Sequence, residues 1–265
     1  MHDEWSQAVD ARGQAAERLA EAVRSGKPCP PIRDLIATVT DAYAVQEINT
    51  RRAIGEGRRP VGRKIGITNL ELQKKFGIDR PDFGMLFADM AYPDGLPIPL
   101  DRFLQPRVEA EVALVLGRDL TGGPFTVADV LRAVEFALPA IEIADSRIAD
   151  WDITLADTVA DNAAAGAFVL GCTPVSLTGL DLRAAGMTMT RGGQEVSTGS
   201  GAACLGSPLN AAVWLASELG RTDYALRAGD VVLTGALGPV STVEPGDVFE
   251  AHVEGLGSVR AVFAQ

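Results

Sequence analysis

The sequence predicts an α+β fold, in which N-terminal helices precede a body made mostly of strands. Residues 4–25 are rich in Ala, Glu and Arg, a composition typical of a helix. From Pro60 onwards, strand-like segments separated by Gly and Pro dominate, without a regular alternation of strands and helices. We therefore expect a helical region at residues 1–57 and a β-rich body at residues 58–265, together forming one compact unit.

The two N-terminal helices end at residues that disfavour helix. The first ends before Pro30, because proline lacks an amide donor and restricts the residue before it. The second is expected over residues 40–53, ending at Gly55 and Gly57. Apolar residues at helical spacing should face the body: Ala15, Leu19, Ala20 and Val23 in the first helix, and Tyr43, Ala44 and Ile48 in the second.

Local signals also define elements of the body. Thr126 and Asp129 have the spacing of a capping box before a helix expected at residues 130–138, which leads directly into a strand. Residues 187–197 form a predicted hairpin, since Gly192 and Gly193 tolerate the positive φ of a tight turn. Residues 208–219 form an apolar helix with proline near its start, and residues 230–234 and 248–254 form two final strands.

Composition excludes several functions. The formal charge of −11 would repel the phosphates of nucleic acids and anionic membranes, and no apolar run is long enough to span a bilayer. Three scattered cysteines indicate reduced thiols, so we expect a cytoplasmic protein. With only two histidines, His2 and His252, a His-rich zinc site is disfavoured.

Three glutamates interrupt apolar strand-like segments. Glu109 and Glu111 lie within residues 108–116, and Glu142 lies within residues 139–144. In a strand, Glu109 and Glu111 point the same way, about 6–7 Å apart along the backbone. A divalent cation would compensate carboxylates set in apolar sequence, and Mg²⁺ and Mn²⁺ prefer such oxygen ligands. The alternative is a solvated strand face whose glutamates pair with Arg107 or Arg118, and the pattern leaves both interpretations open.

Other polar residues have both a structural and a chemical interpretation. Lys64, between two glycines, is either a surface lysine in a turn or an ammonium beside a bound anion. Asp82 follows a proline and is either a turn former or a partly desolvated carboxylate that exchanges a proton. Residues 157–162 fit turn and capping roles. Thr234 and Gly235 belong to a Gly-rich turn whose amides could face an anionic substrate.

Several motifs taken together resemble the fumarylacetoacetate-hydrolase superfamily, in particular its hydratase/decarboxylase branch. The resemblance covers residues 10–263, nearly the whole chain. Its motifs are GRKIGIT (62–68), PDFGMLFADM (81–90), QPRVEAEVALVL (105–116), LPAIE (138–142), DTVADN (157–162), SPLNAAVWLA (207–216) and LTGALGP (233–239).

The resemblance implies a mixed β-sheet rolled on itself with the N-terminal helices alongside, and a homo-oligomer. It implies Glu109, Glu111 and Glu142 as ligands of Mg²⁺ or Mn²⁺, and Lys64 and Asp82 as acid/base residues. The implied activity is hydration of 2-hydroxypenta-2,4-dienoate to 4-hydroxy-2-oxopentanoate in aromatic meta-cleavage catabolism. The division of proton transfers between Lys64 and Asp82 stays open.

Rival functions use the same site. The nearest are decarboxylation of 4-oxalocrotonate and hydration of a longer 2-hydroxy-2,4-dienoate. The chain length of the substrate depends on Met85, because related hydratases are expected to have a smaller residue at this position of the substrate pocket. Carbon–carbon hydrolysis is disfavoured, because no histidine lies between His2 and His252 to activate water. A non-catalytic subunit is disfavoured, because Lys64 and Asp82 are intact. The resemblance implies association with the related decarboxylase, since hydratases of this kind bind it, and a downstream aldolase is the other expected partner.

Overall fold

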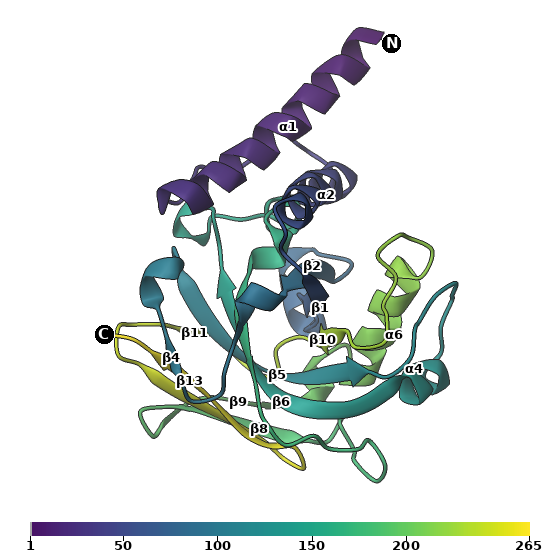
Figure 1. The fold of residues 1–265 in the computed structure, drawn as a ribbon, viewed down its shortest axis with the longest axis vertical. Coiled ribbons are helices and arrows are strands. Elements are labelled where there is room, and N and C mark those ends of the chain that lie inside the picture. Colours follow the sequence, from purple (N-terminus) through teal and green to yellow (C-terminus); the bar gives the residue numbers. More distant parts are fainter. Residues whose placement is uncertain (1) are drawn as a thin grey trace.

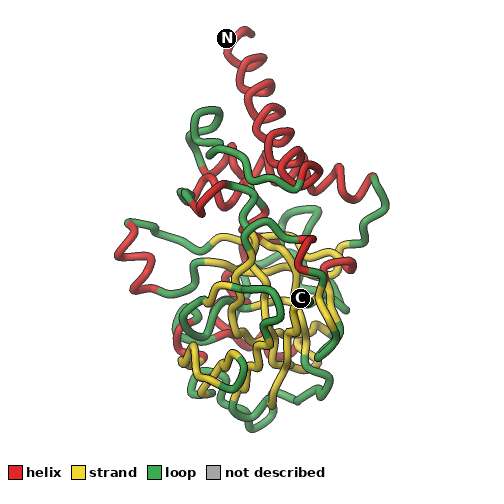
Figure 2. The backbone as a smooth tube through the Cα atoms, turned by 90° about the vertical axis from the view of Figure 1, so that its left-hand side faces the viewer, coloured by secondary structure: helices red, strands yellow, loops and turns green. Residues whose placement is uncertain are grey.

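The computed structural model describes residues 2–265, and it has the expected α+β architecture (Figure 1). Helices lie above and beside a body of strands (Figure 2). The α-helices are α1 (His2–Ser25), α2 (Val39–Gly55), α3 (Leu70–Phe76), α4 (Val127–Ala133), α5 (Leu155–Ala160) and α6 (Pro208–Leu219). None of the helices described is long and apolar enough to cross a membrane.

The larger sheet is mixed and carries the site. Its strands follow the order β2 (Asp82–Phe87), β1 (Pro60–Gly66), β10 (Val231–Leu233), β5 (Pro106–Leu116), β6 (Val134–Asp145), β7 (Ala165–Leu170) and β3 (Ala91–Tyr92), with β11 (Ser241–Thr242) also paired to β5. The β1–β10 and β3–β7 pairs are parallel and the other pairs antiparallel.

A second sheet packs against one face of the first. Its order is β4 (Pro97–Ile98), β13 (Gly257–Phe263), β12 (Val248–Val253), β8 (Gly186–Arg191) and β9 (Gln194–Ser200). Buried residues such as Val112, Ile141, Phe249 and Val259 belong to one apolar cluster between the sheets. The opposite face of β5 and β6 is thereby left for the glutamates, because strand side chains alternate between faces.

The N-terminal helices pack on each other and on α5. Ala15 and Leu19 of α1 and Val45 of α2 share an apolar cluster with Ile148 and Val159 of the body. The inward face of α2 differs from the prediction: Ala42, Val45, Gln46 and Thr50 are buried, and Tyr43, Ala44 and Ile48 only partly. Val23 of α1 is 64% exposed, and it lines the cavity between the N-terminal helices and the body. The division of the chain at residue 57 stays a prediction.

Most local predictions are confirmed. Thr126 and Asp129 form the capping box, β8 and β9 form the hairpin around Gly192 and Gly193, and α6 has the predicted bounds. The helix expected at residues 130–138 is wrong in its second half, since α4 ends at Ala133. Residues 134–138 begin β6 instead, because pairing with β5 satisfies their backbone groups and buries Ala137 and Leu138. The chain also has a further closing strand, β13, which was not predicted.

Candidate metal and acid–base site

The three glutamates lie on one face of neighbouring strands. Glu109 and Glu111 alternate with apolar residues on β5, and the β5–β6 register sets Glu142 directly opposite Glu109. One carboxylate oxygen of each glutamate lies within 4.8 Å of the others. Glu111 and Glu142 are fully buried and Glu109 is half-buried, so a solvated strand face is excluded.

The buried carboxylates accept few hydrogen bonds for their number of oxygens. Glu111 Oε1 and both oxygens of Glu142 are buried without a hydrogen bond. Burial, then the neighbouring glutamates, raises the pKa of Glu109 to about 7 and that of Glu111 well above its usual range. Neither Arg107 nor Arg118 forms an ion pair with them in the described residues. Converging carboxylate oxygens with one ammonium group beside them fit a hard divalent cation such as Mg²⁺ or Mn²⁺, whose charge would offset the burial and the mutual repulsion that raise these pKa values.

Lys64 is a buried ammonium at the edge of this cluster. It lies in the middle of β1, where its Nζ is 3.1 Å from Glu142 Oε1 and donates to the carbonyl of Ala163 at 2.9 Å. Burial alone would lower the pKa of Lys64, but Glu142 and the other surrounding carboxylates reverse this shift, and the net change is upward. Lys64 is therefore a fixed positive charge and not a surface lysine in a turn.

Asp82 begins β2 and lies on the same face as Lys64. The β1–β2 register pairs Gly66 with Asp82 and Lys64 with Gly84. Asp82 is 1% exposed, its Oδ1 has no hydrogen-bond partner, and burial raises its pKa despite the opposing charge of Lys64. Burial makes this carboxyl group hold its proton to a higher pH than an exposed aspartate does, which suits it to exchange a proton with a substrate. Gly66 is required beside it, because a Cβ there would lie 2.2 Å from Asp82 Oδ1.

A left-handed turn that the sequence did not predict holds Lys64 and β2 together. Asn162, Ala163 and Ala164 have φ values of 54°, 52° and 55°, which are unfavourable for residues other than glycine. The Asn162 side chain accepts from the backbone amide of Met85 at 2.7 Å and donates to its carbonyl at 2.9 Å. Ala163 then directs its carbonyl at Lys64 Nζ. Non-glycine residues give no sequence signal for this conformation.

Thr234 and Gly235 lie behind Glu111. The Thr234 hydroxyl donates to the carbonyl of Val112 at 2.8 Å, and the Gly235 amide donates to Glu111 Oε2 at 2.8 Å. These donors orient a glutamate of the cluster. Their contact with substrate stays a prediction.

Two cavities lie away from this cluster. A cavity of about 640 Å³ lies between the N-terminal helices and the body, and none of the candidate site residues lines it. Met85 lines the other, of about 140 Å³, together with Arg63. Met85 and Arg63 pair on the face of the sheet opposite Asp82, so Met85 does not lie beside the carboxylate cluster.

This mixed, curled sheet, with three converging glutamates beside a buried lysine, has the fold of a family of enzymes. The chain belongs to the fumarylacetoacetate hydrolase family: the model described as "Fumarylacetoacetate (FAA) hydrolase C-terminal" matches residues 61–264.

Individual relatives match almost the whole chain. It is 58% identical over 255 residues, 95% of each chain, to "TodF product hydratase" of Pseudomonas putida (strain F1). It is 56% identical over 254 residues, 95% of this chain and 94% of the relative, to "2-keto-4-pentenoate hydratase" of Paraburkholderia xenovorans (strain LB400). Among solved structures, 4-oxalocrotonate decarboxylase from Pseudomonas putida G7, complexed with magnesium and adipate, has a TM-score of 0.90 at 32% identity, covering 96% of this chain and 97% of that one.

Proposed function

We propose that this protein is a metal-dependent hydro-lyase that adds water to 2-hydroxypenta-2,4-dienoate (the enol of 2-keto-4-pentenoate), giving 4-hydroxy-2-oxopentanoate in aromatic catabolism. The observation that carries the proposal is the group of three converging glutamates beside a buried ammonium and a buried carboxyl group. Relatives with 56–58% identity that carry hydratase names support the choice of reaction.

Glu109, Glu111 and Glu142 would hold one Mg²⁺ or Mn²⁺, and the Gly235 amide would keep Glu111 in position. The magnesium in the solved decarboxylase supports a divalent ion. When bound, such an ion acts as a Lewis acid toward the carboxylate and C2 oxygens of a 2-oxo acid.

Lys64 and Asp82 would serve different parts of the substrate. Lys64 is fixed by Ala163 and Glu142 next to the cluster, where its charge stabilises negative charge on the C1 and C2 oxygens of the substrate. Asp82, with its unpartnered Oδ1, would move protons at the carbon chain.

Two steps give a balanced reaction. The dienol loses its hydroxyl proton and gains one at C5, which yields a 2-oxo-3-ene. Water then adds as hydroxyl at C4 and gives up its second proton, and one proton enters at C3. Asp82 in its neutral form can donate and in its ionised form can accept, so one residue can serve successive transfers. Burial raises the pKa of Asp82 and so favours the neutral, donating form more than in an exposed aspartate.

Decarboxylation of 4-oxalocrotonate is the second candidate, favoured by the fold match to the solved decarboxylase. Its identity to this chain is 32%, against 56–58% for the hydratases, so hydration is the better-supported activity. Hydration of a longer dienoate is the third candidate, and Met85, facing the opposite side of β2 from Asp82, gives it no support.

Assembly and location also belong to the proposal. We expect a homo-oligomer in the cytoplasm, with possible association with a related decarboxylase or a downstream aldolase. Light scattering after size-exclusion chromatography measures the assembly, and a monomer at micromolar concentration would contradict it.

The activity test supplies freshly generated 2-hydroxypenta-2,4-dienoate with Mg²⁺ or Mn²⁺ and follows the loss of dienol absorbance. We expect 4-hydroxy-2-oxopentanoate as the product and loss of turnover with a chelator. Turnover of 4-oxalocrotonate alone, with release of CO₂, would select the decarboxylase instead.

A further inference from the structure

Arg107 is a positive side chain at the edge of the candidate site, with no polar partner among the residues that the structure describes. It lies two residues before Glu109 on β5, so strand alternation sets it on the face that carries Glu109 and Glu111. Partial burial lowers the pKa of Arg107, and the nearby carboxylate of Glu109 opposes that shift. No hydrogen bond or ion pair involves its guanidinium in the part of the chain that the structure describes.

An aromatic ring holds this guanidinium in place. The Arg107 guanidinium carbon lies 4.1 Å from the centre of the Trp151 ring, a cation–π contact. The indole is fixed in turn, since Trp151 Nε1 donates to the carbonyl of Gln105 at 3.1 Å. Stacking leaves the N–H groups at the guanidinium edge available, and a planar fork of such donors matches a carboxylate.

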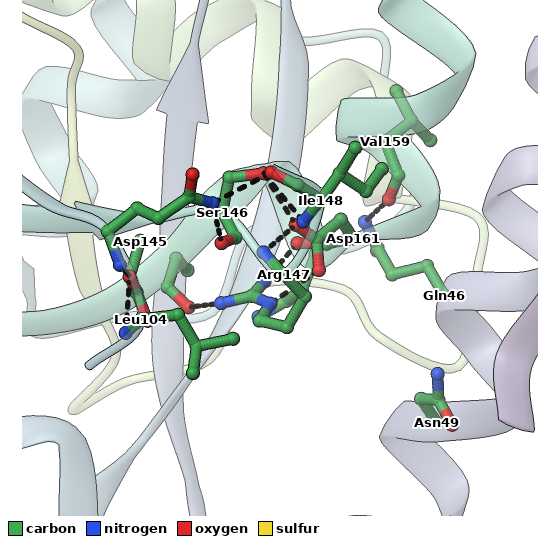
Figure 3. A network of polar contacts seen from close by, with 12 residues as sticks. Gln46, Asn49, Leu104, Asp145, Ser146, Arg147, Ile148, Val159 and Asp161 are labelled. Atoms are coloured by element: carbon green, nitrogen blue, oxygen red, sulfur yellow. Dashed lines mark hydrogen bonds and ion pairs between the residues drawn. The ribbon is translucent and has the colours of Figure 1, made fainter. Parts of the chain in front are cut away.

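The loop that carries Trp151 is strained and firmly anchored. Asp150 and Trp151 have φ values of 59° and 55°, a left-handed conformation that is unfavourable for residues other than glycine. The Asp150 amide donates to Gln105 Oε1 at 2.7 Å, and Gln105 Nε2 donates to the carbonyls of Ser146 and Ile148. Arg147, in the same loop, pairs with Asp161 (Figure 3). Strain that the surroundings maintain in this way is concentrated at functional sites.

The charges of the site call for a further cation. When Asp82 is ionised, the three glutamates, Asp82 and Lys64 carry three formal negative charges, and a divalent ion leaves one. An anionic substrate would still be repelled, and Arg107 cancels the remaining charge.

The solvent-accessible side of the carboxylate cluster is the side on which Arg107 lies. Glu111, Glu142, Lys64 and Asp82 are all buried, whereas Glu109 and Arg107 are half-buried. A ligand that approaches the carboxylates from this side meets Arg107 next to Glu109.

We propose that Arg107, held against Trp151, binds the carboxylate of the incoming 2-oxo acid and so determines affinity for anionic substrates. This inference rests on the proposed function. It makes Arg107 a substrate-binding residue and assigns Trp151 to positioning it.

The test is calorimetric titration of 2-oxopentanoate, a saturated analogue that cannot be hydrated, into Mn²⁺-loaded protein. Loss of a charge-assisted hydrogen bond at a partly exposed site should weaken binding of Arg107→Met about tenfold. Arg107→Lys keeps the charge without the fork and should be intermediate. Arg118→Met is the matched control, because Arg118 is an exposed arginine beyond the other end of β5, and it should bind like the wild type.

Four further outcomes decide between explanations. Equal affinity of Arg107→Met and wild type would overturn the inference while leaving the hydratase proposal intact. Loss of Mn²⁺ binding in Arg107→Met would also overturn the inference. Removing a positive charge beside Glu109 should not lower the affinity of the site for a cation. A wild-type protein that binds the analogue through Arg107 but hydrates no dienoate would contradict the proposed function alone, and one that does not bind the analogue would contradict both.

Discussion

Replacing Gly66 by alanine should damage catalysis while leaving the fold and the metal ligands intact. The new Cβ would lie 2.2 Å from Asp82 Oδ1 and 3.3 Å from Lys64 Nζ, whereas real Cβ contacts are essentially never under 3.0 Å. The Asp82 carboxyl group must therefore retreat to at least 3.0 Å. A misplacement of this size, about 1 Å, can cost roughly 100-fold in rate.

Stability should change much less than rate. The close atom is the end of a side chain and not backbone, and Gly66 is outside the left-handed region, so alanine can adopt its conformation. Reduced entropy of the unfolded chain from Gly→Ala, about 0.4–1 kcal/mol, offsets part of the local strain. We expect kcat to fall about 100-fold with Mn²⁺ affinity unchanged and a melting temperature within a few degrees of wild type.

The assay is steady-state hydration of 2-hydroxypenta-2,4-dienoate, combined with Mn²⁺ titration and thermal unfolding. Gly55→Ala is the matched control, because a Cβ at Gly55 would have nothing within 4 Å. An unchanged kcat in Gly66→Ala would refute the assignment of Asp82 and Lys64 as the groups that carry out the chemistry.

The remaining predictions concern the ligands and the proton. Glu142→Gln removes one of three converging carboxylates and the partner of Lys64, so Mn²⁺ affinity should fall at least 10–100-fold with activity, as measured by titration calorimetry; retention of both would contradict the metal assignment. Asp82→Asn should keep Mn²⁺ but lower kcat 10²–10⁴-fold, roughly the contribution of general acid–base catalysis, and full activity would remove Asp82 from the mechanism. Because the pKa of Glu109 is raised to about 7 in the metal-free protein, protons compete with the ion as pH falls through that value. Mn²⁺ should therefore bind more tightly at pH 8 than at pH 6, and equal affinity would show that Glu109 is not a ligand.

The elements predicted from local signals are confirmed where local signals determine structure. The Gly192–Gly193 hairpin, the Thr126 capping box and α6 depend on residues within a few positions of each other. The boundary between α4 and β6 was wrong, because residues 134–138 pair with β5, a long-range interaction that overrides helical spacing.

The candidate site, like the fold, was predictable from the sequence only where neighbouring residues of one strand determine it. Strand alternation alone set Glu109 and Glu111 on one face. The position of Glu142 opposite Glu109, and of Asp82 beside Gly66, depends on register between strands, which only the family resemblance suggested. The left-handed turn of Asn162 and the contact of Arg107 with Trp151 required the structure, because tertiary packing enforces both.

The most direct measurement is an anomalous difference map from crystals of the wild-type protein grown with Mn²⁺. We expect one strong peak about 2.0–2.2 Å from a carboxylate oxygen of each of Glu109, Glu111 and Glu142, a typical metal–oxygen distance. A peak bound elsewhere, with these three side chains unchanged and free of metal, would contradict the account.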